Sequence, residues 1–243
     1  MMIRSFLLPV LLTLLLSLSV GVLANSADFL EDDKIKIELY YEAQCPGCRD
    51  TITRSFKAAY DAPAFLKMAE ITLVPFGNAK VNGTSAPYSF ECQHGPSECT
   101  YNIMEACALH KIKCPYAQFK FINCLENYDE NREVDQNYDA VVTACATLTE
   151  ISNVAEILTC SKGPEGNELE YAMATKTKDL SPAHKYVPWI VVDGTHDDAT
   201  QQAVQDSLLD FVCQHYKGTT KSPACDGPSS TKEDLVEELM VYK

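Results

Sequence analysis

Residues 35–60 read IKIELYYEAQCPGCRDTITRSFKAAY, and this stretch decides the fold. In Ile35–Tyr41, β-branched and aromatic residues alternate with charged ones, which is the period-two pattern of a partly buried strand. After Cys48 the apolar residues recur at helical spacing. The positions of this apolar stripe are Ile52, Phe56, Ala59 and Tyr60. The sequence therefore predicts a strand, a Cys-Pro-Gly-Cys turn and a helix with one buried face, in direct succession.

Cys45 and Cys48 are placed by this pattern at the N-terminus of the predicted helix. The amide hydrogens there are unpaired and the helix dipole is positive, so a thiolate on Cys45 is stabilised. Pro46 suits the first helical turn, because it has no amide hydrogen to lose. We predict that Cys45 is the nucleophile, with a strongly depressed pKa. Cys48, one turn away and shielded, is predicted to be the resolving thiol.

Cys-x-x-Cys also occurs as a structural disulfide and as half of a zinc site. Zinc normally requires a second ligand pair, such as another Cys-x-x-Cys or His-x-x-x-His, and neither occurs in this chain. The position between a strand and a helix favours redox chemistry. We therefore expect no metal and no cofactor, and a need for an external thiol reductant.

The N-terminus carries one positive charge, Arg4, followed by an apolar run from Phe6 to Val22 and then small residues. This pattern predicts a signal peptide over residues 1–24. A retained anchor is disfavoured, because the apolar run is short for a span and no second one follows. Without Arg4, 19 of the 20 basic residues face 34 acidic ones, a formal charge of −15. We expect no membrane span, and no nucleic acid as a partner.

Eleven cysteines in such a chain indicate an oxidising compartment and a disulfide framework. Nine remain apart from Cys45 and Cys48, so eight can pair and one is left over. The connectivity stays open. We expect Cys225, in the polar C-terminal stretch, to be the unpaired cysteine and to link a homodimer.

A second strand is predicted at Ile71–Phe76, and the helix before it supplies the crossover of a right-handed βαβ unit. This is half of a thioredoxin-like fold. The following segment, Asn78–Tyr88, is rich in Gly, Pro, Ser and Asn and is predicted to be a surface loop. It contains the chain's only glycosylation sequon, so we predict a glycan on Asn82.

Residues 92–107 read CQHGPSECTYNIMEAC, a polar loop that leads into a helix. The residues alone indicate a disulfide-stapled corner. A single loop histidine such as His94 is more often solvated, and nothing in the sequence places it near Cys45. Together with the dithiol, the stretch resembles the Cys-Gln-His-Gly-x-x-Glu-Cys-x-x-Asn-x-x-x-x-Cys signature of the gamma-interferon-inducible lysosomal thiol reductase family. All eight fixed positions match, at Cys92, Gln93, His94, Gly95, Glu98, Cys99, Asn102 and Cys107.

The resemblance spans residues 34–216. It implies a thioredoxin-like α/β fold with a large disulfide-stapled helical insertion. It also implies a thiol–disulfide oxidoreductase that reduces disulfides of unfolded protein substrates in acidic endosomes and lysosomes. The Cys45–Cys48 pair matches the active-site dithiol of the family, and Asn82 falls where such proteins are glycosylated. The signature itself is expected to be structural.

The predicted domain covers residues 34–217, with the helical insertion at about residues 92–180, where apolar residues again follow helical spacing. Four cysteines of the insertion are expected to pack or to form cross-links: Cys114, Cys124, Cys145 and Cys160. A single last helix is expected to bury Val204, Leu208, Phe211 and Val212. Residues 218–243 are predicted to form a tail outside the domain, removable as a propeptide.

Tyr186–Gly194 predicts a short apolar strand that begins with a proline. Proline inside a central strand would remove a ladder hydrogen bond, so Pro188 is placed at the strand's start. In thioredoxin-like folds a cis-proline lies here, opposite the dithiol, and Pro188 resembles it. We expect a cis Val187–Pro188 bond, with the Val187 backbone pairing with an extended substrate segment.

Two other function classes remain open. One is a disulfide oxidase or isomerase of the secretory pathway, and the other is a secreted, non-catalytic, disulfide-rich binding or defence protein. The dithiol disfavours the non-catalytic class. The reduction potential of the dithiol separates a reductase from an oxidase, and the family resemblance favours reduction.

Overall fold

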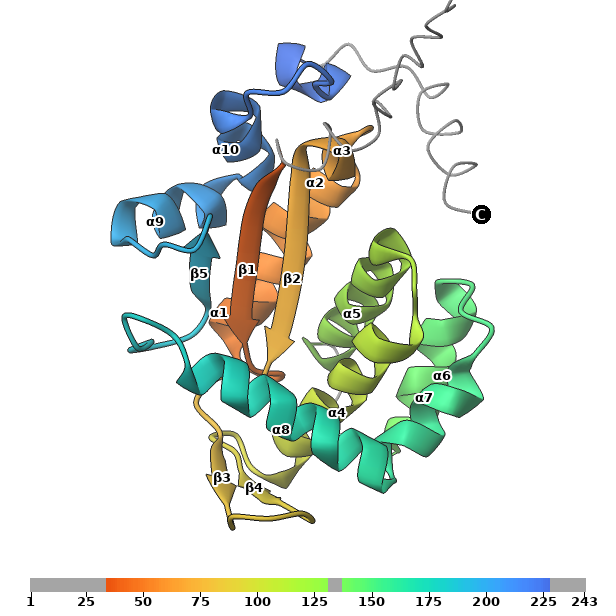
Figure 1. The fold of residues 1–243 in the computed structure, drawn as a ribbon. Helices are drawn as coiled ribbons and strands as arrows, with labels where there is room; N and C mark the ends of the chain where they lie inside the picture. The colour runs from red at the N-terminus through yellow and green to blue at the C-terminus, as the bar shows by residue number, and fades with distance from the viewer. Residues whose placement is uncertain (1–33, 131–136, 228–243) are drawn as a thin grey trace, which may run out of the picture.

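The structure, a computed structural model, describes residues 34–130 and 137–227 and has the predicted α/β organisation (Figure 1). The central sheet has the strand order β2 (Ala69–Pro75), β1 (Ile35–Tyr41), β5 (Trp189–Val192). β1 pairs in parallel with β2, with Leu39 opposite Leu73, and antiparallel with β5, with Leu39 opposite Ile190. The two strands predicted to flank the dithiol helix are therefore neighbours.

The chain between β1 and β2 is the predicted helical crossover. It consists of α1 (Pro46–Asp50), a π-helix η1 (Thr51–Phe56), α2 (Lys57–Tyr60) and α3 (Phe65–Met68). The predicted apolar stripe is buried, and Ile52 and Phe56 have no exposed surface. The π-helical turns change the local winding but leave this stripe facing the sheet.

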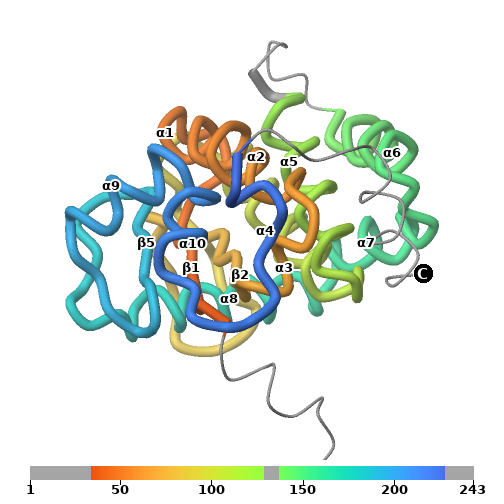
Figure 2. The backbone as a smooth tube through the Cα atoms, turned by 90° about the horizontal axis from the view of Figure 1, so that it is seen from above, coloured from red at the N-terminus to blue at the C-terminus, as the bar shows by residue number. Residues whose placement is uncertain are grey.

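The two faces of the sheet are covered by different helices. Ile37 and Leu39 of β1 pack in the main core with Ile52. Tyr40 points the other way and packs with Trp189 in a second cluster, against which α8 (Pro164–Lys178) contributes Met173. Figure 2 shows α1 and α2 on one side of the strands and α8 on the other. The period-two prediction for β1 is confirmed.

Between β2 and β5 lie a two-stranded hairpin and the predicted helical insertion. These elements are β3 (Lys80–Asn82), β4 (Ser89–Glu91), α4 (Pro96–Lys111), α5 (Pro115–Glu130), α6 (Tyr138–Leu148), α7 (Val154–Ser161) and α8. The Cys107–Cys160 disulfide joins α4 to α7, and Cys124–Cys145 joins α5 to α6. The expected cross-linking of the insertion is confirmed for these pairs. None of the helices in the described parts of the chain is both long and apolar enough to span a membrane.

Cys225 is not the unpaired cysteine. It forms a disulfide with Cys213, and the free cysteine besides the dithiol is Cys114, between α4 and α5. The chain after Cys213 folds back, so the two Cα atoms come within 5.3 Å, a normal disulfide separation. The expectation of a homodimer linked through Cys225 is therefore wrong.

The C-terminal part of the domain differs from its prediction in its last helix and in the segment that follows this helix. The single last helix is two helices, α9 (Asp198–Asp206) and α10 (Leu208–His215). Ser55 is buried at the break, where its hydroxyl donates to the Val204 carbonyl and accepts from the Leu208 N–H. The chain then continues as a 3-10 helix, η2 (Pro223–Asp226).

Residues 218–227, predicted to lie outside the domain, pack on it. Ser222 has no exposed surface, and its N–H donates to Met68 Sδ at 3.2 Å. Together with the Cys213–Cys225 disulfide, this contact makes the segment part of the domain. The predicted signal peptide, residues 1–24, and the rest of the predicted tail, residues 228–243, lie outside the described residues.

Glu170 of α8 has its carboxyl group buried in the protein interior. It has no exposed surface, and neither carboxyl oxygen has a hydrogen-bond partner in the described chain. Burial raises the pKa of Glu170 well above its ordinary value, and the charges of Glu105 and Glu98 act in the same direction. The folded protein therefore keeps a proton that the unfolded chain has lost. The contribution of Glu170 to the free energy of unfolding must then fall as pH rises above the unfolded value of about 4.3, by up to about 1.4 kcal/mol per pH unit.

We expect Glu170→Gln to remove this negative contribution, so that the slope of the unfolding free energy against pH is more positive than in wild type, because the variant has no proton to lose at this position. Urea unfolding of wild type and variant between about pH 4.5 and pH 7.5 measures it. Glu168→Gln, an exposed change on the same helix, should keep the wild-type slope. A Glu170→Gln slope equal to the wild-type slope would contradict the assignment.

Candidate active site

The dithiol lies where β1 runs into α1. Cys45 is the N-cap residue of α1, with Pro46 in the first turn, as predicted. The Cys48 N–H donates to Cys45 Sγ at 3.4 Å. Both thiols are free, and 8% of Cys45 but none of Cys48 is exposed. Cys45 is therefore the thiol that an outside molecule can reach.

The pKa values of the two thiols, like their exposure, favour Cys45 as the attacking thiol. Hydrogen bonding from Cys48 is the main cause that lowers the pKa of Cys45, from its ordinary 9.0 to about 7, against the opposing effects of burial and the Glu42 carboxylate. Burial raises the pKa of Cys48 well above its ordinary value. The pKa of Cys45 is shifted in the predicted direction. These pKa values suit Cys45 to attack as a thiolate and Cys48 to remain protonated until the mixed disulfide has formed.

Pro188 lies against the dithiol turn. The Val187–Pro188 peptide bond is cis, as expected, and Pro188 is buried at the start of β5. A Cβ added to Gly47 would meet Pro188 Cδ at 3.5 Å. Two segments that are far apart in the sequence, the turn and the entry to β5, therefore form one surface beside Cys45.

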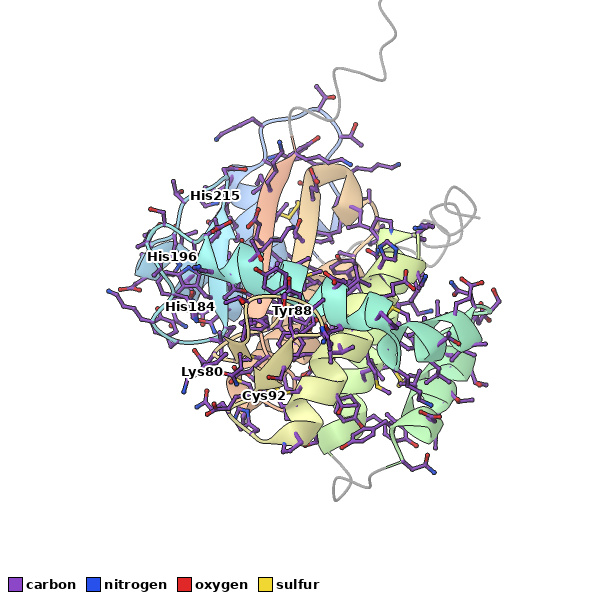
Figure 3. The ribbon with its side chains drawn as sticks, turned by 60° about the horizontal axis from the view of Figure 1, so that its bottom comes forward. Lys80, Tyr88, Cys92, His184, His196 and His215 are labelled. Carbon is purple, nitrogen blue, oxygen red and sulfur yellow. A yellow bond between two sulfur atoms is a disulfide. The ribbon has the colours of Figure 1, made fainter. Side chains whose placement is uncertain are left out.

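The signature segment holds the residues that precede Cys45. The Ala43 N–H donates to Asn102 Oδ1 of α4 at 2.9 Å, and the Ser97 hydroxyl donates to Gln44 Oε1 at 2.8 Å. The Cys92–Cys99 disulfide fastens the end of the β3–β4 hairpin to the start of α4. Figure 3 shows Cys92 near Lys80 at the hairpin end of the molecule. The disulfide-stapled corner expected for this segment is confirmed, and it lies against the active-site loop.

Comparisons with known proteins bear on this pairing of dithiol and signature. A family model described as "Gamma interferon inducible lysosomal thiol reductase (GILT)" matches residues 36–149. The gamma-interferon-inducible lysosomal thiol reductase of Carassius auratus is 36% identical over 208 residues, which cover 84% of this chain and 77% of that protein. The chain belongs to the GILT family. The Mus musculus protein of the same name is 35% identical over 79% of this chain and 71% of its own.

The GILT-family chain also resembles a solved structure. The crystal structure of Chlamydia trachomatis DsbA matches it with a TM-score of 0.50 and 15% identity, covering 71% of this chain and 85% of that one. The fold is thioredoxin-like with a helical insertion, as the sequence predicts.

Glu42 links the signature of this GILT-family chain to the dithiol. Only 1% of Glu42 is exposed, and its Oε2 accepts from the Asn78 N–H at 2.7 Å. His94 Nδ1 lies 3.7 Å from Glu42 Oε1 and 2.7 Å from Glu98 Oε2. His94 is partly exposed, as expected of a loop histidine, but the interpretation that it is merely solvated is wrong. Within the described residues, Glu42, His94 and Glu98 are the group that could hold a metal ion, with ligand atoms within 4.8 Å of one another.

Sequence reasoning missed Glu42 and the contacts of Asn102. A signal for Glu42 was present, because a carboxylate at the end of an apolar strand, three residues before the nucleophile, has no packing reason to be there. The polar fixed positions of the signature gave a second signal. A purely structural corner needs cysteines but has no need of a histidine and a glutamate.

Proposed function

We propose that this chain reduces disulfide bonds of protein substrates in acidic endosomes and lysosomes, with Cys45 attacking and Cys48 resolving. Relatives that match most of the chain are named lysosomal thiol reductases. The observation that carries the assignment of roles is the contrast between the two thiols. Cys45 is reachable and has a lowered pKa, whereas Cys48 is fully buried and has a raised one.

The reaction is two successive thiol–disulfide exchanges. The Cys45 thiolate attacks one substrate sulfur, a mixed disulfide forms, and the other substrate sulfur leaves as a thiolate that takes up a proton. Cys48 then loses its proton and attacks Cys45 Sγ, which releases the second substrate thiol and leaves a Cys45–Cys48 disulfide. Two external thiol groups supply the two electrons and two protons that restore the dithiol and become a disulfide themselves, so the chain needs no cofactor.

An extended segment of substrate is proposed to lie along Val187 and Pro188. The close approach of Pro188 to the Gly47 side of the turn, where an added Cβ would meet Pro188 Cδ at 3.5 Å, supports this, because a strand-like substrate paired with the Val187 backbone would pass Cys45. Backbone pairing is independent of the side chains in the substrate. It suits an enzyme that acts on many unfolded proteins.

The proposed activity is tested by turnover of a denatured, disulfide-containing protein with a thiol reductant at about pH 5 and pH 7. Reduction of the substrate at both pH values is expected. If the oxidised protein instead oxidises a reduced substrate faster than the dithiol form reduces an oxidised one, the chain is an oxidase and the proposal fails.

The proposed function also implies how the protein is processed and where it is located. Residues 1–24 direct the chain into the secretory pathway, towards lysosomes or out of the cell, and the tail from residue 228 is removable. A single domain then remains, with its helical insertion at about residues 92–180. The four described disulfides support an oxidising route, because such bonds form and persist there.

Asn82 is proposed to carry a glycan, since it lies exposed at the end of β3 in the hairpin. We expect Asn82→Gln and Thr84→Ala, produced in a eukaryotic secretory host, each to lose the mass of one glycan. Ser85→Ala is the matched control, because it changes the next residue and keeps the sequon. Mass spectrometry before and after enzymatic deglycosylation reads the result, and a wild-type protein without a mass change would refute the site.

A further inference from the structure

We propose that two side chains of α4, Asn102 and Ser97, are positioning residues for the nucleophile. They hold Gln44, the residue before Cys45, in a left-handed backbone conformation and so fix the place of the thiol. The proposal deepens the proposed function and rests on Cys45 being the nucleophile. It gives the signature segment a part in the reaction, in addition to the structural role expected from the sequence.

The backbone of Gln44 has a conformation that glutamine rarely adopts. Its φ is +65°, in the left-handed region. For a residue with a Cβ, this region is disfavoured against the right-handed one by roughly five- to thirty-fold. Such a conformation persists only where its surroundings enforce it, and it is found most often at functional sites. The contacts that enforce it at Gln44 therefore also determine where the next residue, Cys45, lies.

Gln44 turns the chain from β1 into α1. Residues 42–45 form the whole connection between the strand and the helix. Cys45 already belongs to the helix terminus, because its carbonyl accepts from the Arg49 N–H at 3.0 Å. A change of conformation at Gln44 would rotate Cys45 against this terminus. Its Sγ would then leave the Cys48 N–H, which donates to it at 3.4 Å.

Two hydrogen bonds from α4 hold this connection in place. Asn102 Oδ1 accepts from the Ala43 N–H at 2.9 Å, and Asn102 has no exposed surface. The Ser97 hydroxyl donates to Gln44 Oε1 at 2.8 Å. The first bond fixes the backbone before Gln44, and the second fixes its side chain. Together they oppose the relaxation of Gln44 to a commoner conformation.

Asn102 is poorly matched to a purely structural role. Its Nδ2 is buried without a hydrogen-bond partner among the described residues. A buried polar group without a partner lowers the stability of the fold. A side chain needed only for packing would avoid this loss, whereas one needed for its acceptor oxygen would keep it. The unpartnered nitrogen therefore supports a role for Asn102 in placing the loop before Cys45.

The test is the ultraviolet absorbance of the thiolate in the reduced protein, from which the spectrum of Cys45→Ser is subtracted. At about pH 7 wild type should have a thiolate on about half of its molecules, because the pKa of Cys45 is about 7. We expect Asn102→Leu, which removes the acceptor but keeps a similar volume, to lower this fraction to about a fifth or less. The reason is that the loop relaxes and Cys45 Sγ loses the Cys48 N–H. Near-UV circular dichroism checks that the variant is folded.

Glycine at position 44 separates a positioning role from a structural one. Because glycine adopts positive φ about as readily as negative φ, Gln44→Gly added to Asn102→Leu should restore most of the thiolate. Gln44→Ala in the same background is the matched control. It removes the same side chain but keeps the Cβ, so it should restore none. If Asn102 only stabilised the fold, neither change at position 44 would restore the thiolate.

Ser97→Ala gives an independent measurement. Ser97 is half-buried, so this variant is expected to fold even if Asn102→Leu does not. We expect it to lower the thiolate fraction to roughly a third, because one modest hydrogen bond to the loop is lost. Thr100→Ala is the control on the same helix, since the Thr100 hydroxyl donates to the Pro96 carbonyl and not to the loop. It should keep the wild-type fraction.

Two results would overturn the proposal. One is a wild-type thiolate fraction in both Asn102→Leu and Ser97→Ala, and the other is a loss that Gln44→Ala restores as well as Gln44→Gly does. The spectrum needs no substrate, so these failures are separate from a failure of the proposed function. Full reductase activity of Cys45→Ser would defeat the function, whereas unchanged thiolate with an inactive Cys45→Ser would defeat only the positioning role.

Discussion

Cys45→Ser is expected to abolish disulfide reduction, with a loss of roughly 10³-fold or more, because the hydroxyl that replaces the thiol does not ionise near neutral pH and cannot attack a disulfide. The change is small in volume and lies at the edge of the core, where 8% of the residue is exposed. The fold should therefore survive. Turnover of a denatured disulfide protein measures the loss, and near-UV circular dichroism checks the packing.

Cys48→Ser should give a different defect. Cys45 can still attack, but the buried partner that would attack Cys45 Sγ is missing, so covalent complexes with substrate should accumulate. Non-reducing electrophoresis with a labelled substrate shows such complexes, and they should disappear on reduction. Cys114→Ser is the matched control, since Cys114 is free but lies outside the dithiol, and it should keep full turnover. Normal turnover in Cys45→Ser would reverse the assignment, as would complexes formed by Cys45→Ser in place of Cys48→Ser.

The features that sequence reasoning predicted are mostly local. A strand of period two followed by a helical stripe fixes which face of β1 and of the dithiol helix is buried, and Ile37 and Ile52 lie in the core as expected. The dithiol then falls at a helix N-terminus by chain connectivity alone. Pro188 was predicted from a rule of strand pairing, because a proline is tolerated only where a ladder hydrogen bond is absent.

The features that were missed depend on how distant segments dock. The cluster at Glu42 needs α4 to come against the end of β1, and no periodicity in either segment shows that contact. The pairing of Cys225 with Cys213 likewise depends on the chain turning back after α10. With nine cysteines there are nine choices of the unpaired one and about 105 ways to pair the other eight, which gives hundreds of arrangements. The count could therefore predict one unpaired cysteine but not that it is Cys114.

The break between α9 and α10 has a similar origin. Val204 and Leu208 keep helical spacing through the break, so the sequence pattern predicts one continuous helix. The structure satisfies the free backbone groups with Ser55, which comes from the π-helix η1 that packs against both helices. A polar residue buried in one element can therefore end a helix in another, and a one-dimensional pattern carries no trace of it.

The Cys107–Cys160 disulfide is expected to be the most stabilising of the four, because it closes the longest loop, 53 residues between α4 and α7. Constraint of the unfolded chain over such a loop is worth about 4 kcal/mol, whereas the 7-residue Cys92–Cys99 loop is worth about 2 kcal/mol. Both cysteines of the longer pair are almost fully buried, so alanine is the least disruptive replacement. We expect Cys107→Ala/Cys160→Ala to lose about twice the unfolding free energy that Cys92→Ala/Cys99→Ala loses, measured by urea unfolding of the oxidised proteins. The larger loss should reach the active site, since α4 carries Asn102, which accepts from the Ala43 N–H, and Glu98, which contacts His94 beside Glu42. Equal losses, or a larger loss for the shorter loop, would show that local packing of the signature corner outweighs loop closure.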